Sequence, residues 1–281
     1  MTAVDIAVAT PEEVDLLVEW AAREGWNPGR ADAAPFRAAD PAGFLVARLD
    51  GAPVSGVSVV TYGDGYAFLG FYICAPEHRG RGLGWSVWQA GLAHAGARTV
   101  GLDGVVAQQD NYRRSGFALV HRNVRFGGRV NLPVVDRPSV RPYGPSDLAA
   151  LAAWDAPRFG ARRDGFLAAW CDGRGGRIVR LFVEGGRIRG WGAIRPCREG
   201  HKIGPLFAEE PRIAEVLFAV LAGSVGDTML FLDPPEPNTA ACALAEAHGL
   251  APVFETARMY RGPAPDLPLG EIWGITSFEL G

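Results

Sequence analysis

The sequence predicts a protein of the α/β (α+β) class with two tandem domains, each a mixed, mostly antiparallel sheet flanked by helices. Its length of 281 residues fits one large domain or two modest ones. Hydrophobic residues make up 48% and charged residues 21%, which is typical of a folded globular chain and excludes the disordered and fibrous classes. An internal repeat favours two domains.

The two halves repeat the same landmarks in the same order. The matched pairs are Pro11 with Pro145, Trp20 with Trp154, Gly56 with Gly190 and Gly70 with Gly204, each 134 residues apart, and Arg125 with Arg258, 133 apart. Glycines and prolines are common in this chain, so a single match means little. The shared order and spacing of the matches indicate the repeat. We expect domains over residues 1–136 and 137–281, joined by a proline-bearing linker at Asn131–Pro142.

Each half has the same expected order of elements. A proline near the first helical turn, an acid and apolar residues at helical spacing predict the opening helix, and a Gly turn separates the two strands that follow. The first half reads helix 11–24, strands 44–49, 54–62 and 66–74, helix 82–96, strand 98–103, helix 108–115 and strand 117–126. The second reads helix 145–158, strands 178–183, 188–195 and 201–207, helix 211–222, strand 227–232, helix 238–247 and strand 250–260. The tail Pro263–Gly281 has no counterpart, and Glu271–Phe278 predicts an extra strand.

Composition and spacing exclude several classes of protein. The net charge of −3 gives no support to a nucleic-acid partner or an anionic membrane surface, and no apolar run approaches the roughly 18 residues of a membrane span. Without an export signal we expect a cytoplasmic protein whose four separated cysteines stay reduced. The five histidines lack zinc-site spacing, so no metal is expected.

The most informative segment joins the third strand of the first half to the following helix. It contains Arg79, Gly80, Arg81, Gly82, Leu83 and Gly84. A glycine-rich turn before a helix aims main-chain N–H groups and the positive end of the helix at one point, which suits an anion. The arginines add donors for phosphate oxygens, and Pro76 helps end the strand pairing so that the strand splays from its neighbour.

Three known phosphate-binding patterns could explain this glycine-rich turn. A dinucleotide fingerprint fails because Trp85 stands where its third glycine belongs, and a P-loop fails because the only lysine, Lys202, lies elsewhere. The remaining pattern, RxxGxG at residues 79–84, resembles the pyrophosphate-binding motif of the GNAT family of N-acetyltransferases. Asn111–Phe117 is similar to the Y-x-x-x-G-F segment of that family.

The resemblance implies binding of acetyl-CoA and assigns roles to individual residues. The backbone of Ile73 and Cys74 would meet the thioester and pantetheine, residues 79–84 the pyrophosphate, and Tyr112 would protonate the leaving thiolate. A phenol with a pKa near ~10 is protonated at neutral pH and can serve as a general acid. One departure is Val105, where the family often has asparagine.

The second half lacks these features. The repeat places Ile213–Phe218 on the glycine turn and Ala245 on Tyr112, so the second domain is expected to be a degenerate GNAT module that shapes the acceptor site. We expect transfer of an acetyl group to an amine of a small molecule or peptide. A non-catalytic acyl-CoA-binding regulator and a transferase of a longer acyl group remain open, and the sequence does not indicate the oligomeric state.

Other residues allow two interpretations each. In tandem relatives that modify aminoglycosides, the terminal carboxylate can reach the active site, so the tail here is a candidate to deliver Gly281 or Glu279 towards Tyr112. The alternative is an edge strand that ends in solvent. Asp103 could orient an amine or cap a turn, and Trp26 could line a pocket or pack in the core.

Overall fold

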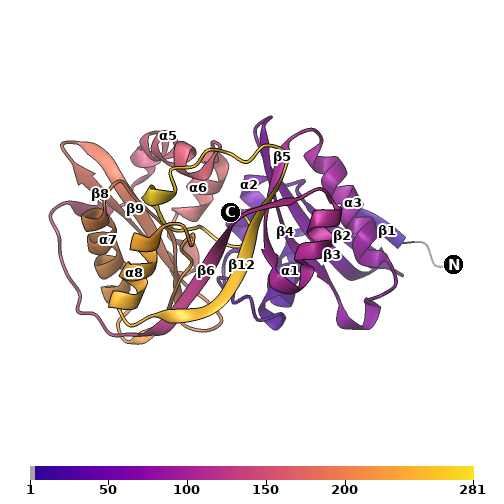
Figure 1. Cartoon of the computed structure of the whole chain (residues 1–281), viewed down its shortest axis with the longest axis horizontal. Helices are drawn as coiled ribbons and strands as arrows, with labels where there is room; N and C mark the ends of the chain where they lie inside the picture. Colours follow the sequence, from indigo (N-terminus) through magenta and orange to yellow (C-terminus); the bar gives the residue numbers. More distant parts are fainter. Residues whose placement is uncertain (1–3) are drawn as a thin grey trace.

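The computed structural model describes residues 4–281, which form two lobes on one continuous 13-stranded sheet (Figure 1). The strand order is β1-β2-β3-β4-β5-β12-β6-β11-β10-β9-β8-β7, and β13 pairs with β10 outside this path. Within residues 4–281, only the β4–β5 and β10–β11 pairs are parallel. The predicted fold class, a mixed and mostly antiparallel sheet flanked by helices, is confirmed.

The first half contains a strand and a short helix that the sequence pattern did not predict, β1 and α2. Its elements are β1 (Val4–Val8), α1 (Pro11–Arg23), α2 (Ala33–Ala39), β2 (Phe44–Leu49), β3 (Ala52–Tyr62), β4 (Tyr66–Cys74), α3 (Leu83–Ala95), β5 (Thr99–Val105), α4 (Gln109–Arg114) and β6 (Ala118–Val130). α1 starts with a capping box, in which Glu13 N–H donates to Thr10 Oγ1 over 3.3 Å and Thr10 N–H donates to Glu13 Oε2 over 2.8 Å.

The second half repeats this order after the segment expected to be a linker, which contains β7. Its elements are β7 (Val140–Pro142), α5 (Leu148–Phe159), α6 (Asp164–Trp170), β8 (Ile178–Glu184), β9 (Arg187–Pro196), β10 (His201–Ala208), α7 (Pro211–Gly223), β11 (Thr228–Leu232), α8 (Thr239–Ala247), β12 (Ala251–Arg261) and β13 (Ile272–Gly274). The extra strand expected over Glu271–Phe278 is therefore only three residues long. Among residues 4–281, no helix has the length and apolar character needed to cross a bilayer.

The last strand of each half pairs with a strand of the other half. β6 lies beside β11, β12 lies beside β5, and the two exchanged strands pair with each other (Figure 1). The sheets of the two halves therefore join into one continuous sheet through the exchanged strands. Repeat-equivalent residues Asn123 and Thr256, 133 positions apart, face each other in the β6–β12 register, so an internal pseudo-twofold axis passes through this pair.

Two buried ion pairs follow the same symmetry. Arg125 on β6 donates to Asp233 of the second half through Nε (2.8 Å) and Nη2 (2.7 Å). Its repeat partner Arg258 on β12 donates to Asp103 of the first half over 2.9 and 2.8 Å. Because both pairs are bidentate and their side chains are buried, loss of one partner would leave a charge uncompensated in the core.

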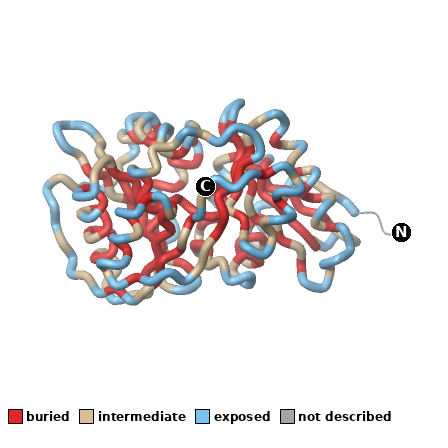
Figure 2. The backbone as a smooth tube through the Cα atoms, viewed as in Figure 1, coloured by how far each residue is buried: buried red, intermediate tan, exposed pale blue. Residues whose placement is uncertain are grey.

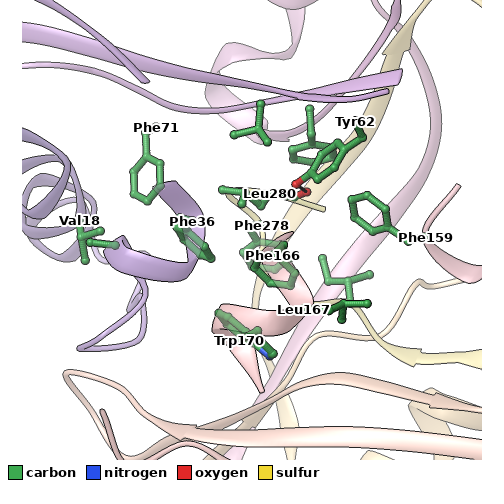
Figure 3. Packing of buried hydrophobic residues seen from close by; sticks show 14 of the residues in the cluster. Val18, Phe36, Tyr62, Phe71, Phe159, Phe166, Leu167, Trp170, Phe278 and Leu280 are labelled. Carbon is green, nitrogen blue, oxygen red and sulfur yellow. Dashed lines mark hydrogen bonds between the residues drawn. The ribbon is translucent and has the colours of Figure 1, made fainter. Parts of the chain in front are cut away.

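A common hydrophobic core joins the two lobes (Figures 2 and 3). Phe36 of α2 stacks on Trp170 of α6 with ring centroids 6.0 Å apart, and Phe71 of β4 packs against Phe36 at 5.9 Å. Each half also has a core of its own, between its sheet and α3 or α7. The shared core makes the lobes a single packed unit, because neither could separate without exposing large aromatic side chains.

The tail crosses from the second lobe to the first and is buried over residues 272–281. The interpretation that it ends in solvent is therefore wrong. Figure 3 shows Leu280 beside Tyr62, whose hydroxyl donates to the Leu280 carbonyl over 3.3 Å. Gly281 lies against the rings of Phe68 and Phe159.

The glycines matched by the repeat, Gly70 and Gly204, make room for the tail backbone. A Cβ at Gly70 would lie 2.1 Å from the Glu279 carbonyl oxygen, and one at Gly204 would lie 2.6 Å from that of Thr276. We predict that Gly70→Ala destabilises the protein by about 1 to 3 kcal/mol, because backbone must move to relieve the overlap. Chemical denaturation measures this loss.

Gly65→Ala is the matched control, since a Cβ at Gly65 would meet no atom within 4 Å and the residue lies in the turn just before β4. Equal stability of the two variants would contradict the docked position of the tail.

Candidate functional site

β4 and β5 separate towards their carboxyl ends. Their parallel pairing runs from Tyr66–Thr99 to Leu69–Leu102 and stops there, although both strands continue. Phe71 has a φ of +46°, and the β3–β4 register shifts between Ser58–Gly70 and Gly56–Ile73. This bulge bends β4 away from β5, so the separation begins before Pro76, which the sequence had suggested as its cause.

The two expected thioester contacts face opposite ways. Ala75 N–H donates to the Val54 carbonyl on β3, and Ile73 lies two residues earlier in the same antiparallel register. Because donors alternate along such a ladder, the Ile73 amide points to β3 and the Cys74 amide points into the gap beside β5. Cys74 is thus the better placed of the pair to donate to a group in the gap.

The glycine turn leads into α3 with unpaired main-chain donors. Gly80 and Gly82 have φ values of +76° and +79°, and a Cβ on either would meet nothing within 4 Å. Gly82 caps α3 without any side-chain hydrogen bond, and Ser86 N–H to the Gly82 carbonyl is the first helical bond. The N–H groups that follow Gly82 are therefore available to an anion at the positive end of the helix.

The arginines of this turn mainly brace the loop. Arg79 donates from Nε to the Cys74 carbonyl over 2.9 Å and pairs with Glu24. Arg81 lies within 3.0 Å of His78 Nδ1. Arg79 therefore fixes the turn against the end of β4 and Arg81 contacts His78, which leaves the main-chain amides as the free donors for phosphate.

A cavity of about 520 Å³, here called the outer cavity, connects these parts. Its lining includes Cys74, the glycine turn, Val105 and Tyr112, which come from β4, the α3 N-terminus, β5 and α4. A neighbouring hollow of about 380 Å³ lies between α3 and α4, beside Trp85 and Asn111. Of the sequence-predicted site residues, all but Arg81 thus line one opening.

Tyr112 is held firmly at the inner end of the outer cavity. Its ring stacks on Trp88 of α3 with centroids 5.6 Å apart, and a Cβ at Gly104 would lie 2.6 Å from the ring, so only glycine fits beneath it. Burial raises the pKa of Tyr112 above its ordinary value of 10.0, with a smaller contribution from Tyr72. The hydroxyl therefore carries its proton at neutral pH and can donate it.

A smaller chamber, here called the inner cavity, also borders Tyr112 and has a volume of about 30 Å³. Both cavities are lined by Trp26, Tyr72, Val105 and Tyr112. The inner cavity also takes residues from distant segments, namely Asp103, Phe254, Thr256, Phe278 and Glu279.

The equivalent position in the second half is closed. β10 and β11 stop pairing after Ile203–Leu232, and Ile203 is the repeat match of Leu69, but β13 then pairs with β10 at Leu206 and Phe207. Only Glu209 and Glu210 connect β10 to α7, and Arg189 binds both carboxylates. The tail occupies the gap and acidic side chains stand at the helix N-terminus, so this half offers no phosphate site.

Some of the lining could not be found from sequence. Phe254 and Thr256 reach the first half only because β12 is exchanged, and no local pattern marks that exchange. The sequence left open whether Trp26 lines a pocket or packs in the core. In the structure Trp26 lines both cavities. Among the described residues, no group of three His, Cys, Asp or Glu side chains could hold a metal ion.

Comparison with known proteins agrees with this geometry. The profile of the acetyltransferase (GNAT) family matches residues 12–118, and that of an acetyltransferase (GNAT) domain matches residues 151–274. The chain is 32% identical to the holothin acyltransferase of Pseudoalteromonas sp. (strain SANK 73390) over 97% of its own length and 93% of the relative. The chain belongs to the GNAT acyltransferase family.

Solved structures show the same fold. A candidate acetyltransferase from Pyrococcus horikoshii has a TM-score of 0.81 at 23% identity. The match spans 100% of this chain and 97% of the Pyrococcus chain. A tandem GNAT protein from the clavulanic acid biosynthesis pathway has a TM-score of 0.60 at 13% identity, with 93% and 100% coverage. The tandem GNAT arrangement and the acyltransferase class predicted from sequence are confirmed, and the family uses acyl-CoA donors.

The strained glycines of the turn allow a direct test of the anion site. We predict that Gly82→Ala weakens coenzyme A binding at least tenfold and costs about 1 to 2 kcal/mol of stability, because alanine disfavours a positive φ. Calorimetric titration with coenzyme A and chemical denaturation measure the two effects.

Gly63→Ala is the matched control, since Gly63 has a φ of +62° with open space around it and lies in the β3–β4 turn. It should lose similar stability and keep its affinity for coenzyme A. Equal affinity in both variants would count against the turn as the pyrophosphate site.

Proposed function

We propose that this protein is an acetyl-CoA-dependent N-acetyltransferase that acetylates an amine of a small molecule or peptide. The observation that carries the proposal is the outer cavity, where an uncapped helix N-terminus, a splayed strand and a protonated tyrosine share one opening. Other proteins bind phosphate groups at helix N-termini in the same way.

Each part has a chemical role in the proposal. The amides of residues 80–84 hold the pyrophosphate, and the Cys74 amide donates to the thioester carbonyl as negative charge develops on its oxygen. The acceptor nitrogen forms the new bond to the acyl carbon while the carbon–sulfur bond breaks. Tyr112 gives its proton to the departing thiolate and regains one through water from the acceptor nitrogen, which loses a proton as the amide forms. Ile73 keeps the strand paired to β3 and so fixes the direction of the Cys74 amide.

The second half contributes to the acceptor side. Phe254 and Thr256 of β12 and the tail residues Phe278 and Glu279 line the inner cavity together with Tyr112. In this proposal the degenerate domain shapes the acceptor site and binds no acyl-CoA of its own.

The relative named above acts on holothin, which makes holothin the first compound to test as an acceptor, together with a panel of primary amines. Release of free thiol from acetyl-, butyryl- and octanoyl-CoA separates the candidates. Turnover of acetyl-CoA supports the proposal, preference for a longer chain identifies a different acyl group, and binding without release would indicate a regulatory protein.

We predict that Tyr112→Phe lowers kcat by about 100-fold or more, because loss of a general acid typically costs that much. The KM for acetyl-CoA should stay within about twofold, since the ring still stacks on Trp88. Steady-state thiol release measures both constants.

Tyr260→Phe is the control for removal of a buried hydroxyl. The Tyr260 hydroxyl has no hydrogen-bond partner within the described part of the chain, and the residue lines neither cavity. Its kcat should match the wild type. A fall of the same size in both variants would mean that Tyr112 acts only through packing.

A further inference from the structure

The loop between α1 and α2 belongs to the first half but lies against the second. It spans residues 24–32 and is here called the α1–α2 loop. Trp26 of this loop lines both the outer and the inner cavity. Glu24 lines the outer cavity and pairs with Arg79 of the glycine turn. The position of the α1–α2 loop therefore sets one wall of the proposed acyl-CoA site.

Two buried cations bind consecutive carbonyl groups of this loop. Arg125 on β6 donates from Nη1 to the Trp26 carbonyl over 2.6 Å. Lys202 on β10 donates from Nζ to the Asn27 carbonyl over 2.9 Å. Both cations lie beside the Asp233 carboxylate of the second half, which is 2.7 Å from Arg125 Nη2 and 4.0 Å from Lys202 Nζ. Hydrogen bonds from charged donors are stronger than those between neutral groups, so the two carbonyls are held firmly.

The turn between β9 and β10 fastens the same loop at a second place. The Asn27 side chain bonds the backbone of Glu199 in both directions. Asn27 Nδ2 donates to the Glu199 carbonyl over 3.1 Å, and Glu199 N–H donates to Asn27 Oδ1 over 3.0 Å. Arg30 donates from Nε to the Cys197 carbonyl over 2.8 Å and from its N–H to the Pro196 carbonyl over 3.0 Å. The loop is therefore fixed to the second half along several residues.

Lys202 departs from the internal repeat at this point. The repeat matches it to Phe68 on β4, 134 residues earlier, whose ring centroid lies 5.0 Å from the Arg258 guanidinium. Arg258 is the repeat match of Arg125, and within residues 4–281 its side chain donates hydrogen bonds only to Asp103. A lysine thus replaces an aromatic ring in the half whose cations bind a loop of the other half.

A buried ammonium group is costly, so its partners indicate why it is kept. Burial lowers the pKa of Lys202 below its ordinary value of 10.5, as does the nearby charge of Arg125, whereas Asp233 raises it. Asp233 already has a bidentate partner in Arg125, which balances its charge without the lysine. Within residues 4–281, the one hydrogen-bond acceptor of the Lys202 ammonium is the Asn27 carbonyl. The loop therefore accounts for the lysine better than the ion pair does.

We propose that the second half positions Trp26 in the wall of the acyl-CoA site through the β9–β10 turn and through Lys202, which is a positioning residue. Lys202 acts by binding the carbonyl of the residue after Trp26, and Arg125 binds the Trp26 carbonyl itself. The degenerate half thereby contributes to acyl transfer without touching acyl-CoA. The proposal rests on the proposed function only in identifying the outer cavity as the acyl-CoA site.

Lys202→Met tests the role of the ammonium group. Methionine keeps a long unbranched side chain without a charge or a donor, and Asp233 keeps its pair with Arg125, so the variant should fold. With 5-fluorotryptophan in place of the eight tryptophans, the fluorine NMR signal that Trp26→Phe abolishes is that of Trp26. In Lys202→Met this signal should shift or broaden before any ligand is added, because the loop carbonyl has lost its donor.

Coenzyme A binding and turnover show what the displacement does to the site. The pyrophosphate is proposed to bind the amides of residues 80–84, so the affinity of Lys202→Met for coenzyme A should stay close to that of the wild type by calorimetric titration. The kcat for thiol release from acetyl-CoA, with the best acceptor of the amine panel, should fall about tenfold or more, because small displacements around reacting atoms are costly. The KM for acetyl-CoA should change little.

Two further variants complete the test. Asn27→Gly keeps the loop carbonyl and suits the φ of +49° at this residue, but it removes both side-chain bonds to Glu199, so it should also move the Trp26 signal. The control is Ile213→Val, which removes one buried carbon atom from the second half's own core, among whose described members there is no residue of the α1–α2 loop. It should leave the Trp26 signal and kcat unchanged.

A Trp26 signal and a kcat that match the wild type in Lys202→Met would overturn the proposal, and so would an equal change in Ile213→Val. If Lys202→Met does not fold, Asn27→Gly decides the matter alone, and an unchanged Trp26 signal in that variant would overturn the proposal.

Failure of the two proposals can be told apart. If the Trp26 signal moves in the variants but the wild-type protein binds no coenzyme A, the loop contact stands and the outer cavity is not an acyl-CoA site. If coenzyme A binds and the Trp26 signal is the same in all variants, the proposed function stands and the role of Lys202 is wrong.

Discussion

The reciprocal exchange of β6 and β12 is the constraint on which the rest of the structure depends. Each exchanged strand carries an arginine to a buried aspartate of the other half, in the pairs Arg125–Asp233 and Arg258–Asp103. The exchange makes one sheet out of two and places Phe254 and Thr256 of the second half inside the first. A buried charge without its partner strongly destabilises the folded state. Because the partners come from different halves, each exchanged strand must stay in place for both lobes to remain folded.

One scaffold has produced two different outcomes at equivalent places. In the first half, β4 and β5 separate and a glycine turn leads into α3, which leaves a gap bordered by free amides. In the second half, β13 occupies the corresponding gap and two glutamates replace the turn. The same tail that closes the second site continues into the first and lines its inner cavity. The closed gap in the second half and the lined cavity in the first therefore have a single structural cause.

The inner cavity shows how a fold can keep a locally unfavourable group. The buried Glu279 carboxylate has no hydrogen-bond partner within residues 4–281 and would be more stable in water or beside a cation, but the tail holds its backbone against Gly70. Sequence and packing agree over most of this molecule, and local conflicts of this kind are expected where a protein binds its ligands. The inner cavity is thus built from elements that stabilise the fold on either side of one destabilising carboxylate.

The sequence by itself determined the tandem repeat, the order of most helices and strands, and the glycine turn with Tyr112, because these depend on local periodicity and on residues close together in the chain. It missed β1, α2, α6 and β7, whose short segments carry little periodicity. It attributed the strand separation to Pro76, whereas the bulge at Phe71 causes it. Strand exchange, the closed second site and the buried tail were decided only by tertiary structure, because each depends on contacts between residues more than 60 positions apart, such as Gly70 with Glu279 and Leu206 with Gly274. Local sequence patterns do not predict which distant segment of the backbone will fill a gap.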